Sequence, residues 1–273
     1  MGFPPDGLAS AMRYRPAASD LFVATYPKCG TTWVQYILYL LFRQQPIRSD
    51  ERLGPRFPHL EEAGAELIEQ GTPPRLIKTH LPVAMAPWSP EARYVVVIRN
   101  PFDCAVSFYF HTRGFPKHYD FADGEFADFV ACFIAGEVDF GDYFDHLLPW
   151  VAKSDCENVS VVRYEDLRRN PAKLIRQIGV FCGGAAEQFV HDDDALEWVV
   201  HESSLERMKR DQQRWSSPRP EDLPFVRAGA VGRWQDLFSP AAARLLAEKF
   251  RRRTVGTAAA DLWPEVIAEA EGL

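Results

Sequence analysis

Residue types that bind phosphate are gathered between positions 26 and 33, where the sequence reads Tyr-Pro-Lys-Cys-Gly-Thr-Thr-Trp. A glycine such as Gly30 lets a ligand approach the backbone closely, and the free amides at the start of a following helix point toward an anion. Thr31 and Thr32 add hydroxyl donors, and Lys28 adds a positive charge. The run therefore predicts a phosphate-binding loop between a strand and a helix. Read alone, the same residues would also suit ordinary helix capping and turn chemistry.

A second phosphate-binding side chain, Arg99, follows a run of branched residues at positions 95–98. A cation at this strand end binds phosphate, whereas a magnesium-dependent nucleotide enzyme usually offers an aspartate there. The loop at Lys28 also differs from the Walker sequence, because its lysine precedes the glycine and no second glycine lies upstream. Open α/β sheets bind ligands at the carboxyl ends of their strands, so we expect two phosphate sites at neighbouring strand ends.

Four short apolar segments predict the strands that position these side chains. They are Leu21–Thr25, Arg75–Thr79, Tyr94–Arg99 and Val159–Tyr164. Helical patterns are found at Thr31–Gln44, from Pro101 through Ser107, at Phe126–Ala135, at Asp142–Ala152, from Pro171 onward, and at Pro240–Arg253. Short buried strands that alternate with helices are typical of an α/β fold, and we expect a central, mainly parallel β-sheet flanked by helices on both faces.

A length of 273 residues suits one large α/β domain over positions 1–273, although length alone would also permit two smaller domains. Positions 1–20 are expected to form an N-terminal extension. Two stretches look irregular, 113–124 and 211–227, and the second carries three prolines. Ordered loops of this length are usually lids or binding segments, so we predict that both cover the substrate or the cofactor.

The composition excludes several classes of protein. Hydrophobic residues make up 47% and charged residues 25% of the chain, as in an ordinary globular protein. The formal net charge of −7 gives no electrostatic footprint for nucleic acid, so an anion site must be local. The first 20 residues lack the apolar stretch of a signal peptide, and the longest apolar run, 33–42, is too short for the roughly 20 residues of a membrane span. We therefore expect a cytoplasmic protein.

The cysteines and histidines do not form a pattern that binds metal. The five cysteines are Cys29, Cys104, Cys132, Cys156 and Cys182, and no two of them form a CxxC pair. The seven histidines are scattered, and the closest pair, His111 and His118, has no thiol or carboxylate nearby at ligand spacing. We expect reduced thiols and no metal site.

Further motifs make the sequence resemble the cytosolic sulfotransferase family. The loop at 26–33 resembles the family's 5′-phosphosulfate loop, and Arg99-Asn100-Pro101 with Ser107 resembles its 3′-phosphate motif. Lys78-Thr79-His80-Leu81-Pro82 is similar to the segment that carries the family's catalytic histidine. Later matches are Gly136-Glu137-Val138 with Gly141 and His146, Tyr164-Glu165-Asp166-Leu167, and Arg227-Ala228-Gly229 with Gly232 and Trp234. Each motif alone is weak evidence, but all occur in the family's order between positions 21 and 238.

The resemblance implies transfer of a sulfuryl group from 3′-phosphoadenosine 5′-phosphosulfate (PAPS) to a small acceptor, leaving adenosine 3′,5′-bisphosphate (PAP), without a metal. His80 would be the general base, and Lys28 and Lys78 would neutralise charge during transfer. The residues implied to bind the donor are Lys28, Cys29, Gly30, Thr31, Thr32, Trp33, Arg99, Ser107, Tyr164, Ser203, Leu205, Arg227, Ala228 and Gly229. A histidine with an ordinary pKa near 6.5 is mostly neutral at pH 7 and able to take a hydroxyl proton.

Several positions depart from the family pattern. Cys29 stands where the family commonly has serine, Ala228 replaces the usual lysine, and Leu205 stands where an aromatic residue is frequent. Ala228 removes a positive charge from the 3′-phosphate site. The family's C-terminal dimerisation pattern is not recognisable after Trp234, so the sequence leaves the oligomeric state open.

Plainer interpretations stay open for single residues. His80 by itself would more often be a hydrogen-bonded structural histidine, and Trp33 and Tyr164 would suit an apolar core. Two alternative functions also remain, a magnesium-dependent nucleotide or small-molecule kinase and a non-catalytic nucleotide-binding protein. For a sulfotransferase, a hydroxyl is favoured over an amine as the acceptor group, and the aromatic-rich chain favours a partly apolar acceptor over a sugar.

Overall fold

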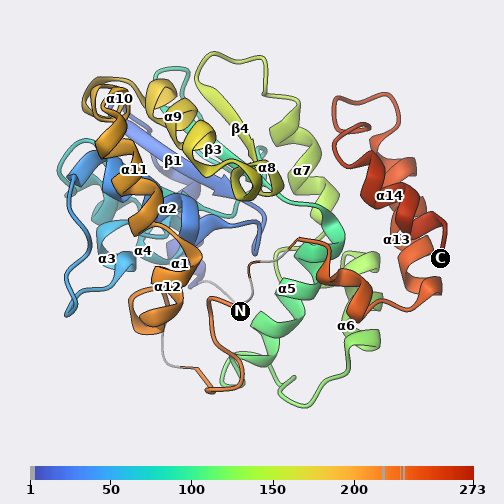
Figure 1. Ribbon diagram of the computed structural model, residues 1–273. Helices are drawn as coiled ribbons and strands as arrows, with labels where there is room; N and C mark the ends of the chain where they lie inside the picture. Colours follow the sequence, from blue (N-terminus) through green and yellow to red (C-terminus); the bar gives the residue numbers. More distant parts are fainter. Residues whose placement is uncertain (1–3, 217–218, 228, 230) are drawn as a thin grey trace.

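A four-stranded parallel β-sheet forms the centre of the computed structural model, which describes residues 4–216, 219–227, 229 and 231–273 (Figure 1). The strands are β1 (Asp20–Thr25), β2 (Arg75–Thr79), β3 (Arg93–Ile98) and β4 (Val159–Arg163), in the order β2-β1-β3-β4. All three pairings are parallel. The predicted parallel sheet and its four strands are therefore confirmed. Ala228, one of the predicted donor-binding residues, lies outside the described residues.

The central strands β1 and β3 are buried on both faces of the sheet, which explains why they are nearly continuous apolar runs. Phe22 and Tyr94 stack against each other on one face, with ring centroids 4.9 Å apart. Val23 and Val95, their neighbours in sequence, are buried in a second apolar cluster on the other face. Because successive side chains of a strand point to opposite faces, each strand contributes to two separate cores.

Helices cover the two faces as separate layers. Figure 1 shows α2, α10 and α11 on one side of the sheet and α5 to α7, α13 and α14 on the other. The helices are α1 (Pro5–Arg13), α2 (Thr31–Arg43), α3 (Leu53–Arg56), α4 (Leu60–Glu69), α5 (Pro101–Arg113), α6 (Phe126–Ala135), α7 (Tyr143–Val151), α8 (Tyr164–Arg169), α9 (Pro171–Cys182), α10 (Gly184–His191), α11 (Asp193–Glu202), α12 (Leu205–Arg210), α13 (Pro240–Thr254) and α14 (Pro264–Glu271), with 3₁₀ turns η1 (Gln212–Arg214) and η2 (Arg233–Asp236). None of the described helices is long and apolar enough to cross a membrane.

The helices expected from the sequence are all present, and two regions contain more structure than expected. The helix from Pro101 continues past Ser107 to Arg113, so α5 is longer than predicted. Positions 1–20 hold a helix, α1, which packs against α4. Of segment 113–124, Arg113 is the last residue of α5 and the rest consists of turns and irregular chain, and segment 211–227 contains the short turn η1.

The carboxyl ends of the strands lead into the predicted site. β1 leads to the loop of Lys28, β2 to His80, β3 to Arg99 and β4 to Tyr164. Parallel strands bring these ends to one edge of the sheet. Side chains from positions as far apart as 28 and 164 can therefore line one cleft.

Candidate active site

The loop between β1 and α2 has a backbone that only a few residue types tolerate. Gly30, the N-cap of α2, has φ = 100°, and Lys28 also lies in the left-handed region, with φ = 71°. A Cβ atom on Gly30 would come within 2.7 Å of the Tyr164 ring. Gly30 is therefore required both by its own conformation and by the close approach of an aromatic residue from the end of β4.

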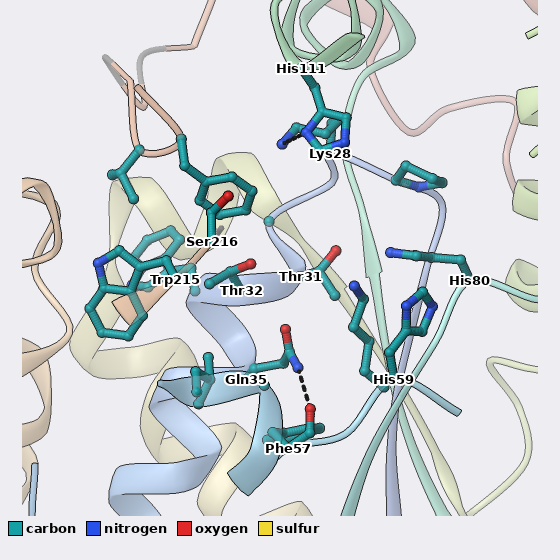
Figure 2. Close-up of a pocket in the computed structure, with 18 of the residues that line it drawn as sticks. Lys28, Thr31, Thr32, Gln35, Phe57, His59, His80, His111, Trp215 and Ser216 are labelled. Atoms are coloured by element: carbon teal, nitrogen blue, oxygen red, sulfur yellow. Dashed lines mark hydrogen bonds between the residues drawn. The ribbon is translucent and has the colours of Figure 1, made fainter. Parts of the chain in front are cut away.

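A cleft of about 1970 Å³ opens above this loop and gathers most of the predicted residues. The predicted residues that line it are Lys28, Gly30, Thr31, Thr32, Trp33, Lys78, His80, Arg99, Ser107, Tyr164, Leu205, Arg227 and Gly229. Figure 2 shows part of this cleft, with Lys28, Thr31, Thr32 and His80 around one open space. Residues from all four strand ends thus share a single cavity.

Two predicted donor-binding residues, Cys29 and Ser203, turn their side chains into the protein. The Cys29 sulfur lies 3.8 Å from the sulfur of Cys104, and burial raises the pKa of the Cys29 thiol well above its usual value. The Ser203 hydroxyl donates a hydrogen bond to the carbonyl of Val199 at 2.7 Å. Both residues are buried, at 1% exposure, so neither side chain lines the cleft.

Arg99 and the loop of Lys28 are in direct contact. The Arg99 guanidinium donates to the carbonyl oxygen of Lys28 at 3.2 Å and lies 4.5 Å from the centroid of the Tyr164 ring. The Tyr164 hydroxyl in turn donates to the carbonyl of Gly229 at 3.1 Å, and the Trp33 ring meets Tyr164 edge to face. The two predicted phosphate sites are therefore adjacent, and aromatic residues lie beside them.

His80 is held in one tautomer at the end of β2. Its Nδ1 lies 2.7 Å from the carbonyl oxygen of Thr25, and because a carbonyl can only accept, Nδ1 carries the proton and Nε2 is left with a free lone pair. Burial and, after it, the nearby charge of Lys78 lower the pKa of His80 well below its usual value. The neutral imidazole is thus the stable form, and a neutral imidazole can accept a proton at Nε2.

Three cations that line the cleft lack a carboxylate partner among the residues that the structure describes. No ion pair to a described carboxylate is formed by Lys28, Lys78 or Arg227. The Lys28 ammonium instead lies 3.3 Å from Nδ1 of His111 and 4.5 Å from the centroid of Phe225. Burial, followed by the charges of Arg219, Lys78 and Arg99, lowers the pKa of Lys28 to about 7. A group of cations without counter-ions fits a polyanionic ligand.

Some residues in the cleft or directly behind its wall were not predicted from the sequence. His111 contacts Lys28, and it lies one helical turn after Ser107, which is a signal that could have pointed to it. The buried Glu61 accepts from the His80 backbone N–H at 2.6 Å and lies 3.4 Å from Nε2 of His59. Arg219 approaches His111 from segment 211–227, and no local pattern in the sequence pointed to that contact.

Comparison with known proteins agrees with this geometry. Residues 18–258 match the model of the sulfotransferase domain family. Human sulfotransferase 1C2 is 30% identical over 92% of this chain and 88% of its own length, and mouse sulfotransferase 1B1 is 28% identical over 89% and 85%. The chain belongs to the sulfotransferase family. The resemblance noted from the sequence is therefore confirmed.

Two solved structures share the fold. Mouse sulfotransferase SULT7A1, solved with PAP, has a TM-score of 0.76 at 22% identity, covering 99% of this chain and 93% of that one. Retinol dehydratase, solved with androsterone and PAP, has a TM-score of 0.81 at 20% identity, covering 92% and 85%. At such low identity these likenesses describe the fold of this sulfotransferase family member.

Proposed function

We propose that the protein transfers a sulfuryl group from PAPS to a hydroxyl group of a small acceptor. The observation that carries this proposal is the cleft that the cations Lys28 and Arg99 line together with a neutral, buried His80. The family match favours this function, and neither the kinase nor the non-catalytic alternative has support from the comparisons.

The donor fits the arrangement of charges. PAPS would supply an activated sulfuryl group and two phosphate-containing ends. Lys28, Thr31 and Thr32 would hold the 5′ end, where the start of α2 offers free backbone amides. Arg99, Ser107, Arg227 and Gly229 would hold the 3′-phosphate, and Trp33, Tyr164 and Leu205 would frame the adenine.

The three catalytic side chains would act on different atoms during the transfer. His80 would take the acceptor's hydroxyl proton at Nε2 as the new sulfur–oxygen bond forms. Lys28 would neutralise the charge that develops on the departing phosphate oxygen, and Lys78 would neutralise charge on the sulfuryl oxygens. These interactions strengthen in the transition state, which is where they lower the barrier.

The acceptor side of the cleft combines apolar and polar walls. Phe140 packs edge to face on His80, and Phe115 and Phe225 also line the cleft. His59 lies next to His80, with ring centroids 5.0 Å apart. We expect a partly apolar acceptor with one reactive hydroxyl, or, as a second choice, an amine, and we expect the protein to act in the cytoplasm.

A thermal-shift experiment tests the proposed donor. PAP should raise the unfolding temperature, since a ligand at a hundredfold excess over its Kd stabilises the native state by about 2.7 kcal/mol. ATP with magnesium should have a much smaller effect. A response to ATP with magnesium alone would favour the kinase and contradict the proposal. Transfer of labelled sulfate from PAPS to a panel of phenols, alcohols and amines would then identify the acceptor.

A further inference from the structure

Arg219, in segment 211–227, contacts both its own segment and the end of α5 through the three nitrogens of its guanidinium. Its Nε donates to the carbonyl of Leu223 at 2.9 Å, which ties it to its own segment. Its Nη2 donates to the carbonyl of Phe110 at 3.1 Å, and its Nη1 lies 3.4 Å from Nδ1 of His111. Both acceptors belong to the last turn of α5, where the negative end of the helix dipole attracts a cation; the Phe110 carbonyl accepts from Arg219 in addition to the Gly114 backbone N–H.

Gly114 provides the space for this contact. A Cβ atom on Gly114 would lie 1.6 Å from Nη2 of Arg219 and 2.4 Å from its Cζ. The backbone of Gly114 has φ = −77°, a conformation that any residue can adopt, so the turn itself does not require a glycine. The glycine is therefore needed to leave room for the guanidinium, and we call this space the Arg219 seat. The Phe115 ring also contacts the guanidinium, and its centroid lies 4.5 Å from Cζ of Arg219.

The contact is built without a counter-ion. Arg219 forms no ion pair with a carboxylate of the described residues, and burial, followed by the charge of Arg227, lowers its pKa to about 10. Carbonyl oxygens and an aromatic ring thus hold a partly desolvated cation, which restricts where the segment can lie.

The residues that follow Arg219 reach the donor site. Phe225 lies 4.5 Å from the Lys28 ammonium, and the Arg227 guanidinium lies 3.5 Å from the centroid of Phe110 on α5. Val226 between them is held by a bond from its N–H to the Gln212 side chain at 2.8 Å. The contact of Arg219 with the end of α5 therefore determines where Phe225 and Arg227 lie at the donor site.

We propose that Arg219 is a positioning residue for sulfuryl transfer, which seats segment 219–227 on the Gly114 end of α5 and so holds Arg227 and Phe225 at the donor. The role of the donor in this statement rests on the proposed function. When the segment is seated for only a fraction of the time, the apparent Kd for the donor rises by the reciprocal of that fraction.

The first test replaces the arginine. Arg219→Ala should raise the Kd for PAP, measured by calorimetry, and the KM for PAPS by roughly tenfold or more, with a smaller change in kcat. Arg219→Lys keeps the charge but cannot serve both Leu223 and Phe110, so it should restore little of the affinity. Arg252→Ala, an exposed arginine of α13, is the matched control and should bind PAP like the wild type.

The second test changes only the seat. Gly114→Ala should displace the guanidinium and raise the Kd for PAP as Arg219→Ala does, and it should have no further effect in the Arg219→Ala background. Gly272→Ala is the control, because Gly272 also caps a helix with φ = −81°, and an added Cβ would meet no atom closer than 3.4 Å.

A third measurement does not depend on the donor. Hydrogen exchange should show faster exchange of the amides of Leu223 and Val226 in Arg219→Ala and in Gly114→Ala than in the wild type. Unchanged exchange in both variants would overturn the role of Arg219. An unchanged Kd for PAP in Arg219→Ala, or full rescue by Arg219→Lys, would also overturn it. Failure of the wild type to bind PAP would instead contradict the proposed function.

Discussion

At the scale of single residues, burial lowers the pKa of both a histidine and a lysine in the same cleft. His80 and Lys28 line the same cleft, and burial is the main cause that lowers the pKa of both. For His80 the lowered pKa keeps the imidazole neutral, which suits a base. For Lys28 it makes the charge easy to lose, and the charge is needed to bind an anion. Burial therefore favours the role of His80 as a base, whereas it makes the positive charge of Lys28 depend on pH.

Removal of the imidazole tests the role of His80. His80→Ala should lower kcat by about 10²- to 10⁴-fold, the usual contribution of a positioned proton acceptor. The Kd for PAP should change little, because the proposed donor contacts come from other residues. His191→Ala, a histidine of α10 on the surface, should leave both quantities unchanged. Turnover at the wild-type rate in His80→Ala would remove this residue from the mechanism.

The low pKa of Lys28 predicts a pH dependence. The charged ammonium predominates below pH 7 and is lost as the pH rises through about 7, so kcat/KM for PAPS should decline above that pH. Binding of the donor's negative charges favours the ammonium, so the decline in kcat should come at higher pH. His80 should not limit kcat/KM at pH 6.5, because its pKa lies well below that value.

Rate measurements between pH 5.5 and 9 in steps of half a unit, at constant ionic strength, would test this dependence. In Lys28→Arg the alkaline decline should disappear, since a guanidinium stays charged over this range. A decline that is unchanged in Lys28→Arg would assign it to another group.

Single residue types were the most predictable part of the site. Lys28, Arg99 and His80 each follow a strand, and their chemistry can be read from the residue type and its local motif. The contacts of His111 with Lys28 and Arg219 could not be predicted, because they join positions 83 and 108 residues apart. The inward orientation of Cys29 and Ser203 likewise depends on packing that the sequence does not display.

At the scale of elements, the turn from β1 into α2 depends on one glycine. Gly30→Ala would introduce a Cβ in the left-handed region and only 2.7 Å from the Tyr164 ring. We expect the Kd for PAP to rise by roughly tenfold or more, because either the loop or the tyrosine must move away from the donor. Binding calorimetry with PAP gives the measurement.

A second glycine, Gly256, serves to distinguish backbone strain from the contact with the Tyr164 ring. Gly256 also has a positive φ, 73°, but an added Cβ there would meet nothing within 4 Å. Gly256→Ala should therefore cost about 1–2 kcal/mol of unfolding free energy and leave the Kd for PAP unchanged. Equal losses of PAP affinity in the two variants would show that the contact with Tyr164 is not what matters.

The central strands β1 and β3 were predictable because each is a short, mainly apolar run buried on both faces. The helices α5 and α9 were anchored by a proline at their first position, which is a local signal. α1 was not predicted, because its helical character is completed by packing against α4, a distant partner. The short helices α10 and α12 contain too few turns for a periodic pattern to be recognised.

At the scale of the whole molecule, the C-terminal region supports the site. The indole N–H of Trp263, just before α14, donates to the buried carboxylate of Glu165 at 3.0 Å. The other oxygen of Glu165 accepts from the backbone N–H and the side chain of Asn100, at 2.8 and 2.9 Å. Asn100 directly follows Arg99, so one carboxylate joins the C-terminal region to the proposed 3′-phosphate site. We therefore propose that positions 1–273 unfold as one domain, in a single calorimetric transition.

Loss of the hydrogen bond between Trp263 and Glu165 should weaken PAP binding as well as stability. Trp263→Phe keeps most of the ring but leaves a buried oxygen of Glu165 without its donor, which should lower the unfolding free energy by about 1–3 kcal/mol. The Kd for PAP should rise as well, because Glu165 then holds Asn100 and the neighbouring Arg99 less firmly. Trp198→Phe is the control, because the Trp198 indole forms no hydrogen bond with the described residues and its ring packs against Phe189, away from the cleft. Denaturant unfolding and PAP titration of both variants would decide the matter: a Trp263→Phe protein that loses stability but keeps wild-type PAP affinity would mean that the C-terminal region stabilises the fold without supporting the site.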